Sequence, residues 1–179
     1  MRCALAIAIL TSILVADAAC AQQHEPTRHE HHQPYAGLEK RTIKALSEQQ
    51  LADLRAGRGM SLALAAELNG YPGPKHVLEH AQTLNLADDQ RAEIESLFEA
   101  MRQEAINAGE AVIAAEANLD QLFAEGLADA ASLDAAMRQV AHAHMMLRRT
   151  HLAYHLSTKA VLTPEQVAAY NRLRGYVSN

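Results

Sequence analysis

Apolar residues recur along most of this chain at spacings of three and four, which is the pattern of helices that bury one face. The longest stripe starts at Asp88 and ends about nine turns later at Glu125-Gly126. A second stripe starts at Asp129 or Ser132, either of which can cap a helix, and continues to about Val161. The short connection predicts that the two helices lie antiparallel, stripe against stripe.

The second stripe can be read in heptads as two rows that form a packing seam. One row is Leu133, Val140, Leu147, Tyr154 and Val161, and the other is Met137, His144, His151 and Thr158. An imidazole in a seam loses water and needs a partner. His144 and His151 are therefore each predicted to have a hydrogen bond, a carboxylate from a neighbouring helix, or a metal ion.

Several of these side chains are spaced to share a metal ion. His151 and His155 lie one turn apart on a helix, and the pair His76 and His80 repeats that spacing upstream. His142 and Met146 combine an imidazole with a thioether, ligands that suit copper, nickel, cobalt or zinc. The alternative is that all are hydrogen-bonded core or solvated surface residues, and spacing alone leaves both interpretations open.

The remaining pattern is also helical, and the sequence contains no strand pattern. Helices are predicted over residues 38–56, with Ser47 and Gln50 as an internal cap, over 60–68 and over 75–84. Thr163 should cap a last helix that ends near Gly175. The predicted fold class is all-α, a long antiparallel hairpin with shorter flanking helices. Four segments follow: residues 1–21, 22–37, a helical extension over 38–74, and a hairpin domain over 75–179.

The first 21 residues have the pattern of a signal peptide: Arg2, an apolar run, and Ala19-Cys20-Ala21 as a cleavage site. Cleavage after Ala18 is an alternative, as is a lipid anchor on Cys20, although Asp17 stands where a lipoprotein signal usually has an aliphatic residue. Cleavage after Ala21 leaves a cysteine-free exported domain, without disulfides or thiolate metal sites.

Residues 22–37 are rich in histidine and have little to bury, so a disordered tail is predicted. With a free terminus at Gln22, the amine, two backbone amides and the His24 imidazole could form a planar four-nitrogen site for copper or nickel. Cyclisation of Gln22 would disable this site, and the alternative is a solvated tail.

Composition excludes several classes of function. The net charge is −5 and no basic stripe is present, which argues against nucleic acid as a partner. No second apolar span follows the first, so the mature protein is not expected to be integral to a membrane. Phosphate loops and nucleophile elbows are absent from the sequence, and an enzyme is the weakest interpretation.

Two short segments carry a family resemblance. Leu162-Thr163-Pro164-Glu165-Gln166 matches the Leu-Thr-x-x-Gln signature of the Spy/CpxP family of periplasmic chaperones, and Leu86-Ala87-Asp88-Asp89-Gln90 resembles its first copy, with Ala in place of Thr. The region from His76 to Gln90 is also similar to related periplasmic heavy-metal sensors. The resemblance covers about 75–176 and implies a periplasmic, four-helix hooked hairpin that dimerises.

The chain differs from the related metal sensors in the second half of their metal site. In the metal sensors the second half of the site is a His-x-x-x-Met pair whose positions correspond here to Tyr154 and Thr158, which are poor ligands. His151 and His155 flank that place, so a site here would be shifted. From the spacing of the imidazoles we predict one transition-metal site formed by His151 and His155 with help from His76 or His80. His142 and Met146 have the right spacing about two turns earlier.

Three functions follow from these observations. The first is a periplasmic protein that binds a transition metal in heavy-metal sensing, buffering or resistance, with a membrane-bound regulatory partner. The second is an envelope-stress chaperone that holds unfolded protein clients. The third is a structural bundle without a ligand. A homodimer is expected.

Overall fold

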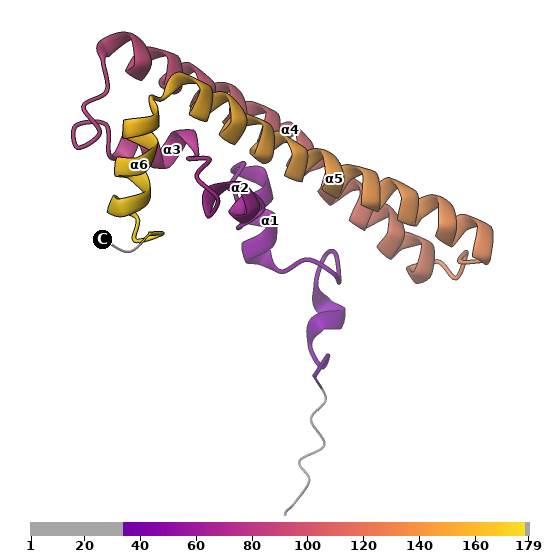
Figure 1. Cartoon of the computed structure of the whole chain (residues 1–179). Coiled ribbons are helices and arrows are strands. Elements are labelled where there is room, and N and C mark those ends of the chain that lie inside the picture. The colour runs from indigo at the N-terminus through magenta and orange to yellow at the C-terminus, as the bar shows by residue number, and fades with distance from the viewer. Residues whose placement is uncertain (1–33, 178–179) are drawn as a thin grey trace, which may run out of the picture. The chain divides into compact units, whose positions relative to one another are not determined.

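A computed structural model of the chain describes residues 34–177, and Figure 1 shows its elements. All regular structure in this part of the chain is helical, which confirms the predicted all-α fold class. The elements in order are a 3₁₀ turn η1 (Leu38–Lys40), α1 (Glu48–Arg55), α2 (Leu64–Glu67), α3 (Pro74–Glu79), α4 (Asp88–Ala124), α5 (Ala130–Val161) and α6 (Pro164–Leu173). No helix in residues 34–177 is long and apolar enough to cross a membrane.

The two long stripes form the expected antiparallel hairpin of α4 and α5. Gly126 has a φ of 69°, the left-handed conformation that ends α4. Asp129 is the N-cap of α5, and its carboxylate accepts a hydrogen bond from the Ser132 amide (2.8 Å) while the Ser132 hydroxyl accepts one from the Asp129 amide (2.9 Å). The two predicted cap residues therefore form one capping box, which starts α5 at Ala130, a few residues after the end of α4.

The buried face of α5 differs from the predicted seam. In its first half the second buried row is Ala136 and Ala143, one position before the predicted Met137 and His144, which are exposed. Small side chains let α5 approach α4 closely. In its second half α5 is also contacted by α2 and α3, so a wider face is covered. The buried residues there are Leu147, Thr150, His151, His155 and Thr158.

The segment before the hairpin is less helical than predicted. The helix expected over residues 38–56 is only η1, turns, and then α1. Ser47 and Gln50 form a complete capping box, so they start α1 and do not lie inside a longer helix. The helix expected over 60–68 is reduced to α2, because Met60 and Ser61 have φ values of 40° and 63°. The helix expected over 75–84 ends at His80, the C-cap of α3.

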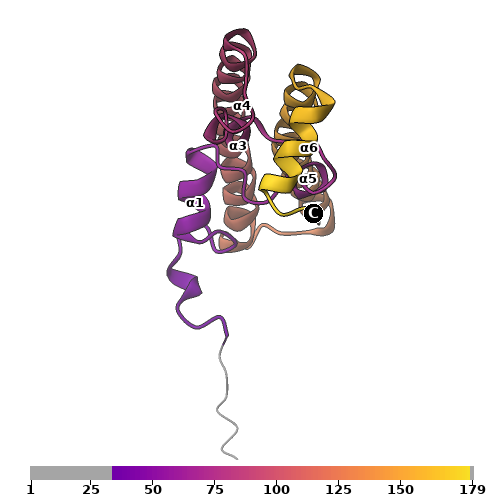
Figure 2. The ribbon, with the colours of Figure 1, turned by 60° about the vertical axis from the view of Figure 1, so that its left-hand side comes forward.

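This segment packs on one side of the hairpin, as do α3 and α6 (Figures 1 and 2). Leu51 and Leu54 of α1 belong to the same buried cluster as Val112 of α4 and Leu147 of α5. Gly109 makes the close approach of α1 to α4 feasible, because a Cβ at that position would overlap the backbone carbonyl of Leu54. The extension is therefore part of the folded core.

The two signature segments meet where α4 and α6 begin. Thr163 caps α6, Pro164 takes its first position and Gln166 completes a capping box, as predicted. The side-chain amides of Gln90 and Gln166 donate to each other's oxygens (3.0 and 2.9 Å). Each also donates to a backbone carbonyl, Gln90 to Val161 (2.8 Å) and Gln166 to Leu84 (3.4 Å). The signature glutamines thus join two helix starts that are 76 residues apart.

Candidate functional site

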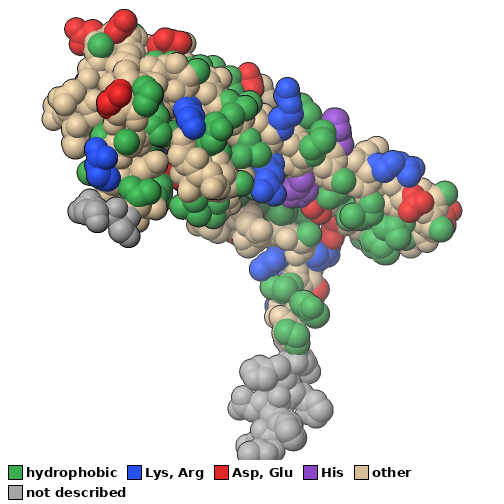
Figure 3. Space-filling view, in the orientation of Figure 1, with side chains coloured by type: hydrophobic (Ala, Val, Ile, Leu, Met, Phe, Trp, Pro, Cys, Tyr) green, Lys and Arg blue, Asp and Glu red, His purple; other side chains and the backbone are tan. Residues whose placement is uncertain are grey.

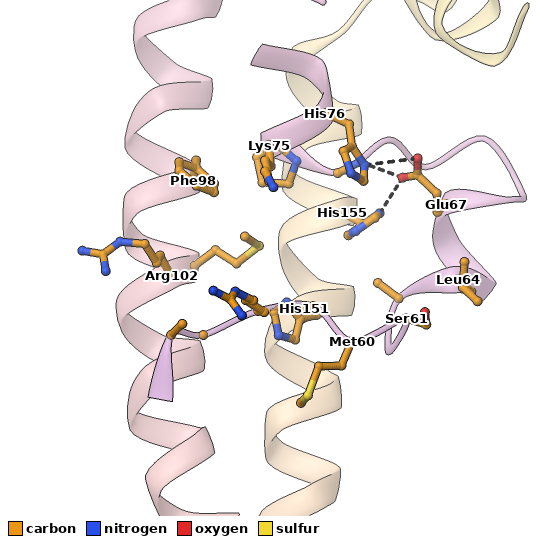
Figure 4. Close-up of a pocket in the computed structure, with 18 of the residues that line it drawn as sticks. Met60, Ser61, Leu64, Glu67, Lys75, His76, Phe98, Arg102, His151 and His155 are labelled. Atoms are coloured by element: carbon orange, nitrogen blue, oxygen red, sulfur yellow. Dashed lines mark hydrogen bonds and ion pairs between the residues drawn. The ribbon is translucent and has the colours of Figure 1, made fainter. Parts of the chain in front are cut away.

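A cavity of about 450 Å³ lies between the N-terminal segment and the hairpin (Figure 4). Three of the predicted ligands line it: His76 from α3, and His151 and His155 from α5. One carboxylate, Glu67 at the end of α2, faces two of these imidazoles. The wall also contains the thioethers of Met60 and Met101 and the basic residues Arg58, Lys75, Arg102 and Arg174.

Glu67 is the best-connected polar group of the site, although only 5% of its surface is exposed. Its Oε1 accepts hydrogen bonds from the hydroxyls of Tyr170 and, at 3.1 Å, Tyr176. Its Oε2 accepts one from the Gly73 amide (3.2 Å). These three donors come from α6, from the chain after α6 and from the start of α3, so Glu67 ties the extension to the rest of the protein.

Basic groups surround the same carboxylate. The Nδ1 of His76 lies 3.5 Å and the Nε of Arg174 lies 3.8 Å from Oε1, while the Nδ1 of His155 lies 3.7 Å from Oε2. Burial alone would raise the pKa of Glu67, but hydrogen bonds from His76, Tyr170 and Tyr176, with the charge of His76, lower it to about 2. Glu67 is therefore an anion throughout the physiological range.

His155 is held by backbone groups. Its Nδ1–H donates to the Tyr71 carbonyl (2.6 Å), because a carbonyl can only accept, and this leaves Nε2 without a proton in the neutral ring. That Nε2 lies against Gly73, where a Cβ would come within 2.8 Å of it. Gly73 therefore has to be glycine for the ring to lie here, because any larger residue would overlap Nε2.

His151 is different, because it is buried without a partner. Only 3% of its surface is exposed, and its Nε2 has no hydrogen bond. Burial lowers its pKa below the ordinary value, and the neighbouring charge of His155 lowers it further. The ring is consequently neutral near pH 7, with a nitrogen that is available to a ligand in the cavity.

The other predicted ligands lie elsewhere. His80 does not line the cavity. His144 is at the edge of the hairpin, not in its buried seam, and its Nε2 lies 3.1 Å from the Glu116 carboxylate of α4. His142 and Met146 are exposed on α5, and His24 lies outside the described residues. In residues 34–177 no three His, Cys, Asp or Glu side chains are arranged to hold a metal ion.

Sequence reasoning missed Glu67 and Met60. A signal for Glu67 did exist: it is the only charged residue between Arg58 and Lys75. An isolated carboxylate in an apolar segment is rarely buried unless it has partners. Met60 carries no such signal, because only the tertiary structure brings it to the cavity.

Comparison with known proteins adds one match. A family model described as LTXXQ motif family protein matches residues 75–174. This span contains both signature segments, α3 and the hairpin, while the residues of η1, α1 and α2 precede it. No curated protein and no solved structure matches the chain.

Proposed function

Because the chain belongs to the LTXXQ motif family, the family of Spy/CpxP-like periplasmic proteins, we propose that it binds a transition metal in the periplasm. The proposed site is the cavity lined by His76, His151 and His155. The metal would be copper, nickel, cobalt or zinc, and the role would be sensing, buffering or resistance. A sensing role would require a membrane-bound regulatory partner.

The observation that carries this proposal is the unpartnered Nε2 of His151. A buried polar atom without a hydrogen bond costs about 1–3 kcal/mol, so it needs an explanation. A metal ion in the cavity would supply one, because a neutral imidazole nitrogen is a good ligand for these metals. His155 and His76 line the same cavity, although both also lie beside Glu67.

Metal binding can be tested on the mature protein by metal analysis and by thermal unfolding. A bound metal should raise the melting temperature by linkage, and replacing both His151 and His155 with Ala should abolish the increase. The matched control is the pair His142→Ala and His144→Ala, two exposed imidazoles of the same helix. Unchanged stoichiometry and an unchanged melting shift in the His151/His155 variant would contradict the proposal.

A second candidate function is a chaperone that holds unfolded clients, and one surface favours it. A groove on α5 combines exposed apolar and basic side chains, and Figure 3 shows such side chains next to each other along the hairpin. Its residues are Met145, Arg148, Arg149, Leu152, Ala153 and Leu156. Apolar surface of this kind is typical of interaction sites.

An aggregation assay separates the two functions. The protein should slow the aggregation of a reduced, unfolded test protein, and Met145→Ser with Leu156→Ser should remove that effect. The His151/His155 variant should keep it. If the serine variant protects as well as the wild type, the groove has no chaperone role.

We also propose that the protein is a homodimer, as expected from the resemblance. At the far end of the hairpin, Phe123 and Leu127 are 58% and 63% exposed. A second copy would cover them, and sedimentation of the wild type against a Phe123→Ser, Leu127→Ser variant tests this. A wild type that is monomeric at all accessible concentrations would contradict the proposal.

A further inference from the structure

We propose that the cavity binds one soft monovalent metal ion, Cu(I) or Ag(I), through the Nε2 of His151 and the thioethers of Met60 and Met101. This inference rests on the proposed function and specifies its metal and its ligands. None of the metal sites expected from the sequence included either methionine. The proposed ligands come from three places: the turn before α2, the first half of α4 and the second half of α5.

The first step of the argument is the ligand chemistry of the cavity wall. Met60 and Met101 line the same cavity as His151, and Figure 4 shows Met60 and His151 at the same end of it. Met101 is 8% exposed, so its sulfur is already largely shielded from water. Thioether sulfur is a soft ligand that favours Cu(I), and imidazole is accepted by copper as well. Neither methionine needs to lose a proton before it can bind.

The second step concerns the other polar groups, which are already in use. The carboxylate of Glu67 accepts three hydrogen bonds. The Nδ1 of His155 is bonded to Tyr71, and Gly73 lies against its Nε2. These contacts leave the unpartnered nitrogen of His151 and the two thioethers as the remaining candidate ligands, and the flexible methionine side chains would turn towards the ion.

The third step is charge. Glu67 is the only acidic residue in the cavity wall, against the basic residues Arg58, Lys75, Arg102 and Arg174. Each of these four cations lies near a carboxylate: Arg58 near Asp53 (2.5 Å), Arg102 near Glu99 (2.7 Å), Lys75 near Glu79 (3.8 Å) and Arg174 near Glu67 (3.8 Å). The wall therefore offers no free carboxylate to balance the charge of a metal ion. With three neutral ligands, a singly charged ion leaves half the uncompensated charge that a doubly charged ion would leave.

The fourth step is the backbone at Met60. Met60 and Ser61 both have a left-handed conformation, with φ values of 40° and 63°. Side-chain-bearing residues adopt this conformation at a cost on the order of 1–3 kcal/mol each, and such residues cluster at functional sites. The turn is closed by a hydrogen bond from the Leu62 amide to the Gly59 carbonyl (2.7 Å). A metal bound to Met60 would offset part of this cost and fix the extension to the hairpin.

The direct test is a titration of the full mature protein with Ag(I), a redox-inert probe, observed through the ¹³C-labelled methyl groups of its methionines. Five of the six methionines follow the predicted signal peptide, and leucine variants assign their signals. Only the Met60 and Met101 methyl signals should shift, and the change should be complete at one equivalent bound in the cavity. The titration itself is carried out on the wild type, and the leucine variants serve only to assign the signals.

Affinity gives the second readout. Met60→Leu and Met101→Leu should each weaken Ag(I) binding at least tenfold in competition with a chelator, and anaerobic Cu(I) should follow the same order. The matched control is Met145→Leu, which removes an exposed thioether from α5 and should change nothing. Equal losses in all three variants, or Ag(I) shifts confined to Met137, Met145 and Met146, would overturn the inference.

Titration with Zn²⁺ and Ni²⁺ separates this inference from the proposed function. One outcome is that Zn²⁺ or Ni²⁺ binds to the wild type but not to the His151/His155 variant, while Ag(I) leaves the Met60 and Met101 signals unmoved. The soft-metal inference would then be wrong and the proposed function would stand. If no metal of either class changes any signal from the cavity, both are wrong.

Discussion

Two polar clusters connect segments that are far apart in the sequence: the half-buried Gln90–Gln166 pair and the buried Glu67 cluster. The Gln90–Gln166 pair is neutral, and both amides donate to each other and to backbone carbonyls. The Glu67 cluster is centred on an ionised carboxylate, which accepts hydrogen bonds from the start of α3, from α6 and from the chain after α6. The pair should hold at any pH, while the cluster holds only as long as Glu67 is ionised.

The largest effect is expected from removing the charge. Glu67→Ala would leave the tyrosine hydroxyls and nearby basic groups without their acceptor, which should cost about 3–5 kcal/mol of unfolding free energy. The matched control is Glu104→Ala, because Glu104 also accepts a tyrosine hydrogen bond, from Tyr154 at 2.8 Å, but on the surface. Urea unfolding of both variants measures the difference, and equal losses would mean that burial of Glu67 adds nothing.

The pH dependence of stability should come next in size. Folding lowers the pKa of Glu67 to about 2, so the folded state favours its ionised form. The resulting stabilisation is complete above the ordinary pKa of about 4.5 and is lost as the pH falls towards 2. Its size is on the order of 2–3 kcal/mol. Urea unfolding between pH 6 and 2.5 should show this loss in the wild type and a smaller one in Glu67→Gln, whereas parallel curves would assign acid sensitivity to other carboxylates.

The glutamine pair should show a smaller and pH-independent effect. Gln90→Ala or Gln166→Ala each leaves the other amide short of a partner, at a cost of about 1–2 kcal/mol. A double-mutant cycle should show positive coupling, since the second substitution removes a group that is already unpaired. Additive losses would indicate that the two amides act independently, through their backbone contacts alone.

The smallest effect is expected at His151. Its pKa is lowered by burial, so the unfolded state takes up a proton first as the pH falls below about 6.5, and the folded state loses stability. His151→Leu should therefore flatten the stability curve between pH 7 and 5. His144→Leu, at an exposed position beside Glu116, is the control. A wild-type curve that is already flat would show that the buried ring is stable in its charged form.

The two clusters also differ in how far they can be predicted from sequence. The glutamines belong to a recognisable signature, and Thr163, Pro164 and Gln166 start α6 where that signature predicts. Their hydrogen bond to each other was not predicted, because helix starts 76 residues apart meet only in the folded hairpin. Glu67 belongs to no motif, and its partners lie 6 to 109 residues away.

The candidate site shows the same division. His151 and His155, which the sequence pairs by spacing, line one cavity, whereas of the pair His76 and His80 only His76 lines it; metal binding by any of them stays a prediction. His144 shared the predicted row with His151 but is exposed. Both histidines lie on α5, but His151 lines the cavity together with residues of α2 and α3, whereas His144 lies beside Glu116 of α4.

The sequence by itself determined the helices that have strong local signals. Apolar periodicity and capping residues placed α4, α5 and α6, because both act within one or two turns of a helix. Only the tertiary structure decided which face of α5 is buried, where the left-handed turn places Met60, and which groups donate hydrogen bonds to the Glu67 carboxylate. Those outcomes depend on the extension packing against a helix far along the chain, as in the bond between Tyr71 and His155, 84 residues apart. The spacing of residues within one helix cannot encode which other segment will cover it.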